Sequence, residues 1–157
     1  MTRRIELIVN GRHVRSLVEP HVTLLRFVRE ETGTVDVKYG CGEGVCGACT
    51  VLLDRTAVNS CSVLAVQADG ATIETVAALS RNGELHPLQR ALVERGAVQC
   101  GFCTPGMVLG ALEAVNLGLA GDAAELRRSL AGNLCRCTGY GKIIEAVEAY
   151  RNSELGT

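Results

Sequence analysis

Eight cysteines fall into two sets of four, and their spacing indicates chemistry that needs several thiolate ligands at one site. The first set has the spacing C-x4-C-x2-C-x11-C and comprises Cys41, Cys46, Cys49 and Cys61. The second set is a C-x2-C pair, a gap of 31 residues and a C-x-C pair, and comprises Cys100, Cys103, Cys135 and Cys137. Because four thiolates can hold a cluster of two irons, two such sets in one chain of 157 residues indicate the transfer of single electrons.

The first set has the ligand spacing of a plant-type 2Fe–2S ferredoxin. Four glycines lie in the loop that carries its first three cysteines, at positions 40, 42, 44 and 47. Glycine permits backbone with positive φ and lets backbone N–H groups point at the sulfurs. A zinc site more often shows two C-x2-C pairs or Cys/His pairs, and a zinc-stabilised scaffold without a redox role is the competing interpretation.

The second set lies in two segments, each between two predicted helices, so four thiolates can meet at one end of a helical unit. A thioredoxin-like redox pair would need a βαβ pattern around the C-x2-C, which this sequence lacks. A Rieske centre needs two histidine ligands, but His13, His21 and His86 all lie outside the cysteine segments. We interpret these histidines as surface or structural residues.

The elements that must position the first set form a small mixed α+β unit of the β-grasp kind. Alternation over 5–9, an Asn10-Gly11 turn and a return strand over 14–18 predict a β-hairpin. Residues 24–28 predict a short helix with Gly33 as its C-cap, and strands are expected over 50–54 and 71–74. We assign this unit to residues 1–78.

The second unit, residues 79–157, is predicted to be a bundle of four short helices. Its apolar residues recur at three- and four-residue intervals over the segments 87–95, 105–118, 123–131 and 141–151. Pro87 and Pro105 suit the first turn of a helix, and Asp122 with Glu125 predicts a capping box.

Composition excludes some partners and favours one compartment. The net charge of −1 offers no basic surface for nucleic acid, and no apolar run approaches the length of a membrane span. Arg3 and Arg4 are not followed by the apolar region of an export signal, so we expect a cytoplasmic protein whose thiols stay reduced.

Three segments make the sequence resemble the small 2Fe–2S iron–sulfur subunit of the molybdenum hydroxylases, the xanthine dehydrogenase and carbon monoxide dehydrogenase family. They are CGEGVCGACTV, QCGFCTPGM and GNLCRCTGYGKI, and the resemblance extends over essentially the whole chain. It implies a plant-ferredoxin-like β-grasp domain followed by a four-helix-bundle domain, each with one 2Fe–2S cluster. It also implies a large subunit with molybdopterin, where substrate is hydroxylated, and a medium subunit with FAD.

The resemblance implies a role for each cysteine. Cys100, Cys103, Cys135 and Cys137 match the ligands of the cluster proximal to molybdenum, and Cys41, Cys46, Cys49 and Cys61 match those of the distal cluster. Gln99 matches the position whose side chain contacts the pterin, and Cys137 matches the ligand closest to the pterin's amino group. Electrons would then pass from molybdenum through the proximal and the distal cluster towards FAD or another acceptor.

Bond-making chemistry is not expected on this chain. The sequence offers no nucleophile–base pair, and its glycines lack the strand–G-x-G-x-x-G–helix context of a dinucleotide site. We therefore predict the electron-transfer subunit of an oxidoreductase, with no catalytic residue of its own. The alternative is a free-standing two-cluster ferredoxin-like carrier, although such carriers often have a strongly acidic surface.

Overall fold

In the computed structural model, which describes residues 1–155, the chain opens with the hairpin that the sequence predicts. Strands β1 (Arg3–Val9) and β2 (Arg12–Val18) pair antiparallel. Asn10 and Gly11 between them have φ values of 49° and 78°, the two positive angles that a type I′ turn requires. Ile5, Leu7 and Val9 are buried together because alternate residues of a strand share one face.

The hairpin forms one side of a mixed sheet in the order β2-β1-β5-β3-β4. The remaining strands are β3 (Thr50–Leu53), β4 (Thr56–Asn59) and β5 (Thr72–Glu74). The sequence predicted β3 and β5 but not the short β4. Strands β1 and β5 are parallel, whereas the other neighbours are antiparallel. Strand β3, which directly follows the first cysteine loop, therefore lies between β5 and the edge strand β4.

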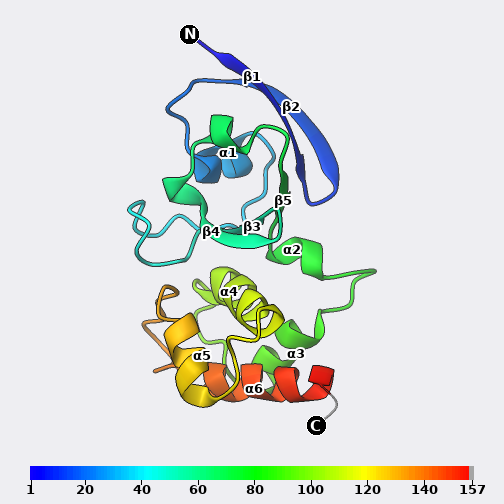
Figure 1. Ribbon diagram of the computed structural model, residues 1–157, viewed down its shortest axis with the longest axis vertical. Helices are drawn as coiled ribbons and strands as arrows, with labels where there is room; N and C mark the ends of the chain where they lie inside the picture. Colours follow the sequence, from blue (N-terminus) through cyan, green and yellow to red (C-terminus); the bar gives the residue numbers. More distant parts are fainter. Residues whose placement is uncertain (156–157) are drawn as a thin grey trace.

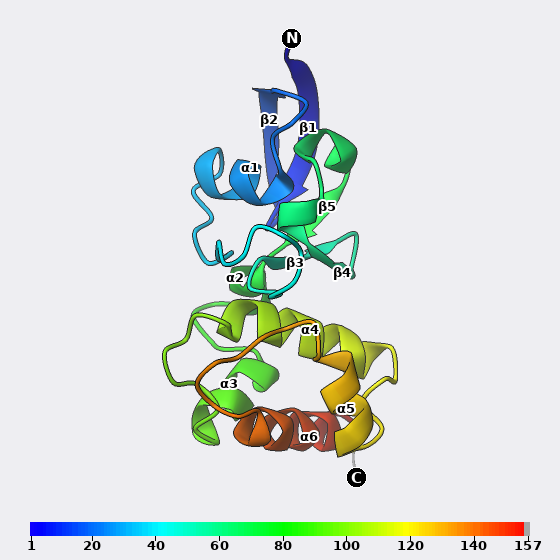
Figure 2. The same ribbon diagram turned by 90° about the vertical axis from the view of Figure 1, so that its left-hand side faces the viewer.

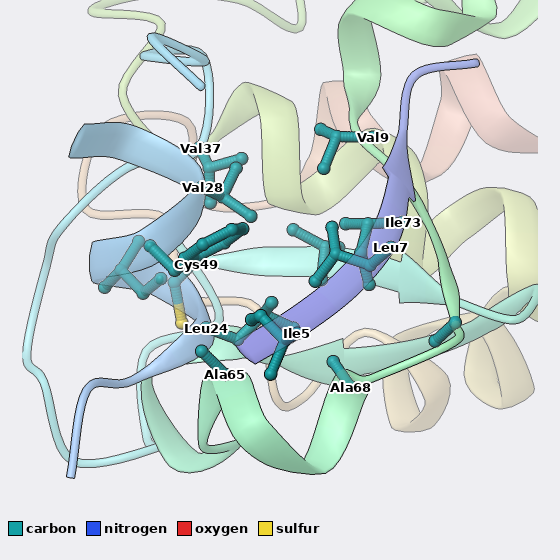
Figure 3. Packing of buried hydrophobic residues seen from close by; sticks show 14 of the residues in the cluster. Ile5, Leu7, Val9, Leu24, Val28, Val37, Cys49, Ala65, Ala68 and Ile73 are labelled. Carbon is teal, nitrogen blue, oxygen red and sulfur yellow. The ribbon is translucent and has the colours of Figure 1, made fainter. Parts of the chain in front are cut away.

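Helix α1 (Leu24–Glu30) covers one face of this sheet (Figure 3). Its buried residues Leu24 and Val28 lie among Ile5, Leu7 and Ile73 of the strands, so helix and sheet share one apolar core. The helix begins after Thr23, whose hydroxyl accepts the N–H of Arg26 at 3.2 Å. It ends with Glu31 as its C-cap, so the expectation that Gly33 caps it was wrong by two residues.

The second half of the described chain is helical. It contains α3 (Pro87–Glu94), α4 (Thr104–Asn116), α5 (Ala123–Ser129) and α6 (Gly141–Leu155). Each matches one predicted segment, but α4 begins one residue before 105–118 and α6 continues beyond 141–151 to residue 155. The unpredicted short helix α2 (Val76–Leu79) precedes them. Pro87 and Pro105 lie in first turns, as predicted. Asp122 caps α5 by accepting the N–H of Glu125, but the Glu125 carboxylate accepts the N–H of Gly121 instead of closing the predicted capping box.

The two halves have separate apolar cores and meet along α4. The second core gathers residues from all of the longer helices, including Leu88, Leu92, Met107, Leu126 and Ile143. Helix α4 lies against β3 and β4 at the end of the sheet (Figures 1 and 2). Near the end of α4, Glu113 Oε1 accepts the backbone N–H of Ala57 at 2.7 Å. Within residues 1–155, no helix combines the length and the hydropathy needed to span a membrane.

Candidate functional site

The first cysteine set lies on the irregular loop between α1 and β3, together with the short 3-10 helix η1 (Ser60–Ser62). Cys41 is exposed and Cys46 half-buried, whereas Cys49 and Cys61 are buried. The sulfurs lie in two pairs. The backbone N–H of Cys41 donates to Cys46 Sγ at 3.4 Å and that of Cys46 donates to Cys41 Sγ at 3.5 Å, while the Cys61 thiol lies close enough to Cys49 to raise its pKa.

Backbone amides of the same loop point at these sulfurs, as the glycine-rich sequence predicts. The N–H of Glu43 donates to Cys41 Sγ at 3.3 Å, and the N–H of Gly44 donates to Cys61 Sγ at 3.2 Å. Gly44 has a φ of 74°, a backbone conformation that favours glycine. Hydrogen bonds from the N–H groups, that of Glu43 foremost, lower the pKa of Cys41 to about 6. The loop therefore stabilises negative charge on sulfur.

The second cysteine set gathers where three helices begin or end. Cys103 directly precedes α4, and Cys135 and Cys137 lie on the segment between α5 and α6. Here too the sulfurs lie in pairs, because Cys100 Sγ is 3.5 Å from Cys137 Sγ and the Cys135 thiol lies close enough to Cys103 to raise its pKa. Cys100 and Cys137 are both exposed. The second set is thus open to a partner on one side.

Each set offers four thiols, the number and type of ligand that a cluster of two irons needs, but within residues 1–155 they lie as pairs and no group of three or more is placed to hold a single metal ion. Two pairs of thiols would supply two thiolates to each iron, and at the first set the N–H groups that donate to sulfur would offset the negative charge of such a cluster. Burial raises the pKa of Cys49 to about 11 and that of Cys103 to about 12. Those two thiols therefore carry protons at neutral pH, and binding of a metal must displace these protons.

Tyr140 is a site residue for which the sequence analysis predicts no role. Its hydroxyl accepts the backbone N–H of Cys135 at 2.8 Å and donates to the carbonyl of Asn133 at 3.3 Å. Tyr140 has a φ of 67°, a backbone conformation that is uncommon for residues other than glycine. The only sequence signal was its place in the GNLCRCTGY segment. Its hydroxyl fixes the backbone on which Cys135 is carried.

Replacing Tyr140 by phenylalanine is expected to lower the stability of the second cysteine segment. Loss of the hydroxyl leaves a half-buried N–H without its partner, which costs about 0.5–1.5 kcal/mol for a typical hydrogen bond. The melting temperature of the purified protein measures the effect. Tyr39→Phe is the matched control, because the Tyr39 side chain is exposed and its change should leave the melting temperature unaltered. Equal melting temperatures for Y140F and the parent protein would contradict this role.

The remaining predicted residues lie as follows. Gln99 is exposed and adjoins the exposed Cys100. His86 caps α3, since its Nδ1 accepts the N–H of Leu88 at 3.2 Å. His13 and His21 are exposed. None of the three histidines belongs to either cysteine set, as expected.

Comparisons with known proteins agree with this donor chemistry. A 2Fe–2S iron-sulfur cluster binding domain matches residues 7–80, and a [2Fe-2S] binding domain matches residues 72–148. The chain is 48% identical to the 6-hydroxypseudooxynicotine dehydrogenase complex subunit beta of Paenarthrobacter nicotinovorans, over 94% of this chain and 93% of that one. It is 45% identical to the xanthine dehydrogenase iron-sulfur-binding subunit of Escherichia coli O157:H7, over 93% and 92% of the two chains.

Solved structures have the same fold. Quinoline 2-oxidoreductase from Pseudomonas putida 86 superposes with a TM-score of 0.90 and 43% identity, covering 98% of both chains. The aldehyde oxidoreductase of Desulfovibrio desulfuricans superposes with a TM-score of 0.91 and 38% identity, covering 98% of this chain but 17% of that one. The same unit therefore occurs as a separate chain in one protein and as a small part of a longer chain in the other.

Proposed function

This chain belongs to the iron–sulfur subunits of the molybdenum hydroxylases, the xanthine dehydrogenase and aldehyde oxidoreductase family, and we propose a specific role for each of its cysteine sets. As a member, it is the electron-transfer subunit of an oxidoreductase complex and carries two 2Fe–2S clusters. Molybdopterin and FAD are carried by the partner subunits. Each cluster, when bound, takes up and releases one electron at a time.

The distal cluster is held by Cys41, Cys46, Cys49 and Cys61. The pairing of these sulfurs supports this assignment, because each pair would supply two thiolates to one iron of the cluster. The N–H groups of Glu43 and Gly44 stabilise the thiolates. This is the observation that carries the proposal, because backbone N–H groups that donate to sulfur stabilise the thiolate form that iron ligation needs.

The proximal cluster is held by Cys100, Cys103, Cys135 and Cys137. Its sulfurs are also paired, and Thr138 Oγ1 lies 3.1 Å from Cys135 Sγ as a further donor. Gln99 and Cys137 contact the pterin of the large subunit. Their exposure beside Cys100 supports this role, since a cofactor on another chain can reach them. Electrons enter the chain at this end and leave from the Cys41 end.

The domain boundary, the arrangement of the helices and the compartment are part of the same proposal. Residues 1–78 form the β-grasp domain and residues 79–157, of which 156 and 157 lie outside the described residues, are assigned to the α-helical domain, whose helices α3–α6 form the four-helix bundle of the family. The two separate cores support this division, although α2 spans the boundary and packs against the second core. The complex acts in the cytoplasm, where eight thiols stay available for metal.

The composition of the native complex tests this function. The chain should co-purify with two larger subunits and contain roughly four irons per copy, two in each 2Fe–2S cluster. A free-standing carrier would instead be recovered as a stable monomer with the same iron. A redox-silent zinc scaffold would contain no iron and show no visible absorption. Recovery as a stable monomer or absence of iron would overturn the proposal, and the iron content distinguishes the free-standing carrier from the zinc scaffold.

A further inference from the structure

The side-chain carboxamide of Asn133 joins the two halves of the molecule close to both cysteine sets. Asn133 lies on the segment between α5 and α6 and is 8% exposed. Its Nδ2 donates to the carbonyl of Gly47 and to Thr50 Oγ1, each at 3.1 Å. These acceptors lie 86 and 83 residues away in the sequence, at the end of the first cysteine loop. Asn133 therefore joins the segment of one cysteine set to the loop of the other.

Three glycines from both halves make room for this carboxamide. A Cβ added at Gly47 would lie 2.5 Å from Asn133 Nδ2, and one added at Gly110 would lie 2.6 Å from Asn133 Oδ1. A Cβ at Gly106 would overlap the Gly47 carbonyl that Asn133 binds. The carboxamide therefore occupies a space that exists only because these three positions lack a Cβ. Around it, the backbone of the first cysteine loop at Gly47 lies close to the backbone of α4 at Gly106.

The backbone around Asn133 is tied directly to both cysteine sets. The N–H of the next residue, Leu134, donates to the carbonyl of Cys46 at 2.9 Å. The carbonyl of Asn133 accepts the Tyr140 hydroxyl, which in turn accepts the N–H of Cys135. A shift of Asn133 would thus move Cys135 relative to Cys46.

The halves have a second anchor that does not depend on Asn133. Glu113 binds the N–H of Ala57 ten residues along α4 from Cys103, which is about 15 Å at 1.5 Å per residue. Removing the Asn133 carboxamide should therefore loosen the cysteine end of the interface and leave the two halves attached.

We propose that Asn133 is a positioning residue whose carboxamide fixes the distance and orientation between the two clusters, and so the rate at which an electron passes between them. The proposal rests on the function given above. Asn133 itself neither binds substrate nor carries an electron. It acts through the backbone that carries Cys135, because the rate of electron transfer falls steeply with the distance between the clusters.

The test uses the complete complex with Asn133→Asp, which replaces the donating amide by a carboxylate facing the Gly47 carbonyl. Asn10→Asp is the matched control, because Asn10 Nδ2 also donates to a threonine hydroxyl, Thr75 Oγ1 at 2.9 Å, but outside the interface. Iron content and the electron paramagnetic resonance spectrum of the reduced complex are measured. The magnetic interaction between the two reduced clusters, seen as line splitting and as relaxation rate, reports their spacing.

We expect N133D to keep its iron and both cluster signals but to lose most of the magnetic interaction, with slower electron equilibration between the clusters after pulse reduction. N10D should match the parent complex. Thr50→Val, which removes one acceptor, should lose part of the interaction and carries the test if N133D does not assemble. An unchanged interaction in both T50V and N133D, an equal loss in N10D, or loss of iron from N133D would overturn the proposal. Absence of cluster signals from the parent complex would instead overturn the function itself.

Discussion

Replacing Cys135 by serine in the assembled complex is expected to abolish turnover with the physiological acceptor, while substrate still reduces the molybdenum centre. Cys135 shares a pair with Cys103 in the second set, and a serine hydroxyl is a poor substitute for a thiolate as an iron ligand. The proximal cluster should therefore be damaged, and electrons have no route out. Steady-state activity, iron content and the molybdenum signal after addition of substrate measure these effects.

Cys46→Ser provides the control for this result and is itself informative. It should abolish the same turnover by damaging the distal cluster, because Cys46 belongs to the first set. The two variants should therefore have equal activity losses but lose different cluster signals. Normal turnover with the physiological acceptor in both variants would contradict the serial arrangement of the clusters.

Gly106→Ala is expected to weaken the junction between the two halves. Alanine is favoured over glycine inside a helix by about 1 kcal/mol, so an isolated α4 would gain stability. In the folded chain the added Cβ would overlap the backbone carbonyl of Gly47, which cannot move without displacing the first cysteine loop. Such overpacking typically costs about 1–3 kcal/mol.

The melting temperature of the G106A protein checks this expectation, and Gly132→Ala is its control. Gly132 also lies beside Asn133, but a Cβ added there meets no atom within 4 Å. G106A should melt at a lower temperature than the parent protein, and G132A should melt with it. A melting temperature for G106A equal to or above that of the parent would show that the contact is not tight.

Local sequence signals predicted the elements that depend on neighbouring residues. The Asn10-Gly11 turn, the strand alternation around Ile5 and the prolines of α3 and α4 are all of this kind. Strand β4 and helix α2, of four residues each, are too short for a periodic pattern to stand out. The order of the sheet depends on contacts far apart in the sequence, such as the parallel pairing of Ile8 with Thr72.

In the candidate site, too, local sequence signals predict some features, whereas others depend on contacts between distant segments. Cysteine spacing alone predicts two sets, because a cluster fixes its ligand types and separations. The role of Asn133 has no such signal, since a single polar residue in a connecting segment is usually exposed. Its burial arises from Gly47, Gly106 and Gly110, which come from two other segments. The role of Tyr140 was not predicted either, because its partners are backbone groups whose positions only the fold defines.

The most direct test of the central claim is a spin count of the fully reduced complex by electron paramagnetic resonance. Two unlike sites in two unlike domains should give two distinguishable 2Fe–2S signals, and each should integrate to about one unpaired electron per copy of this chain. Cys135→Ser should remove one signal and Cys46→Ser the other. A single signal, or a spin count near one for the two sites together, would contradict an electron path with two clusters in series.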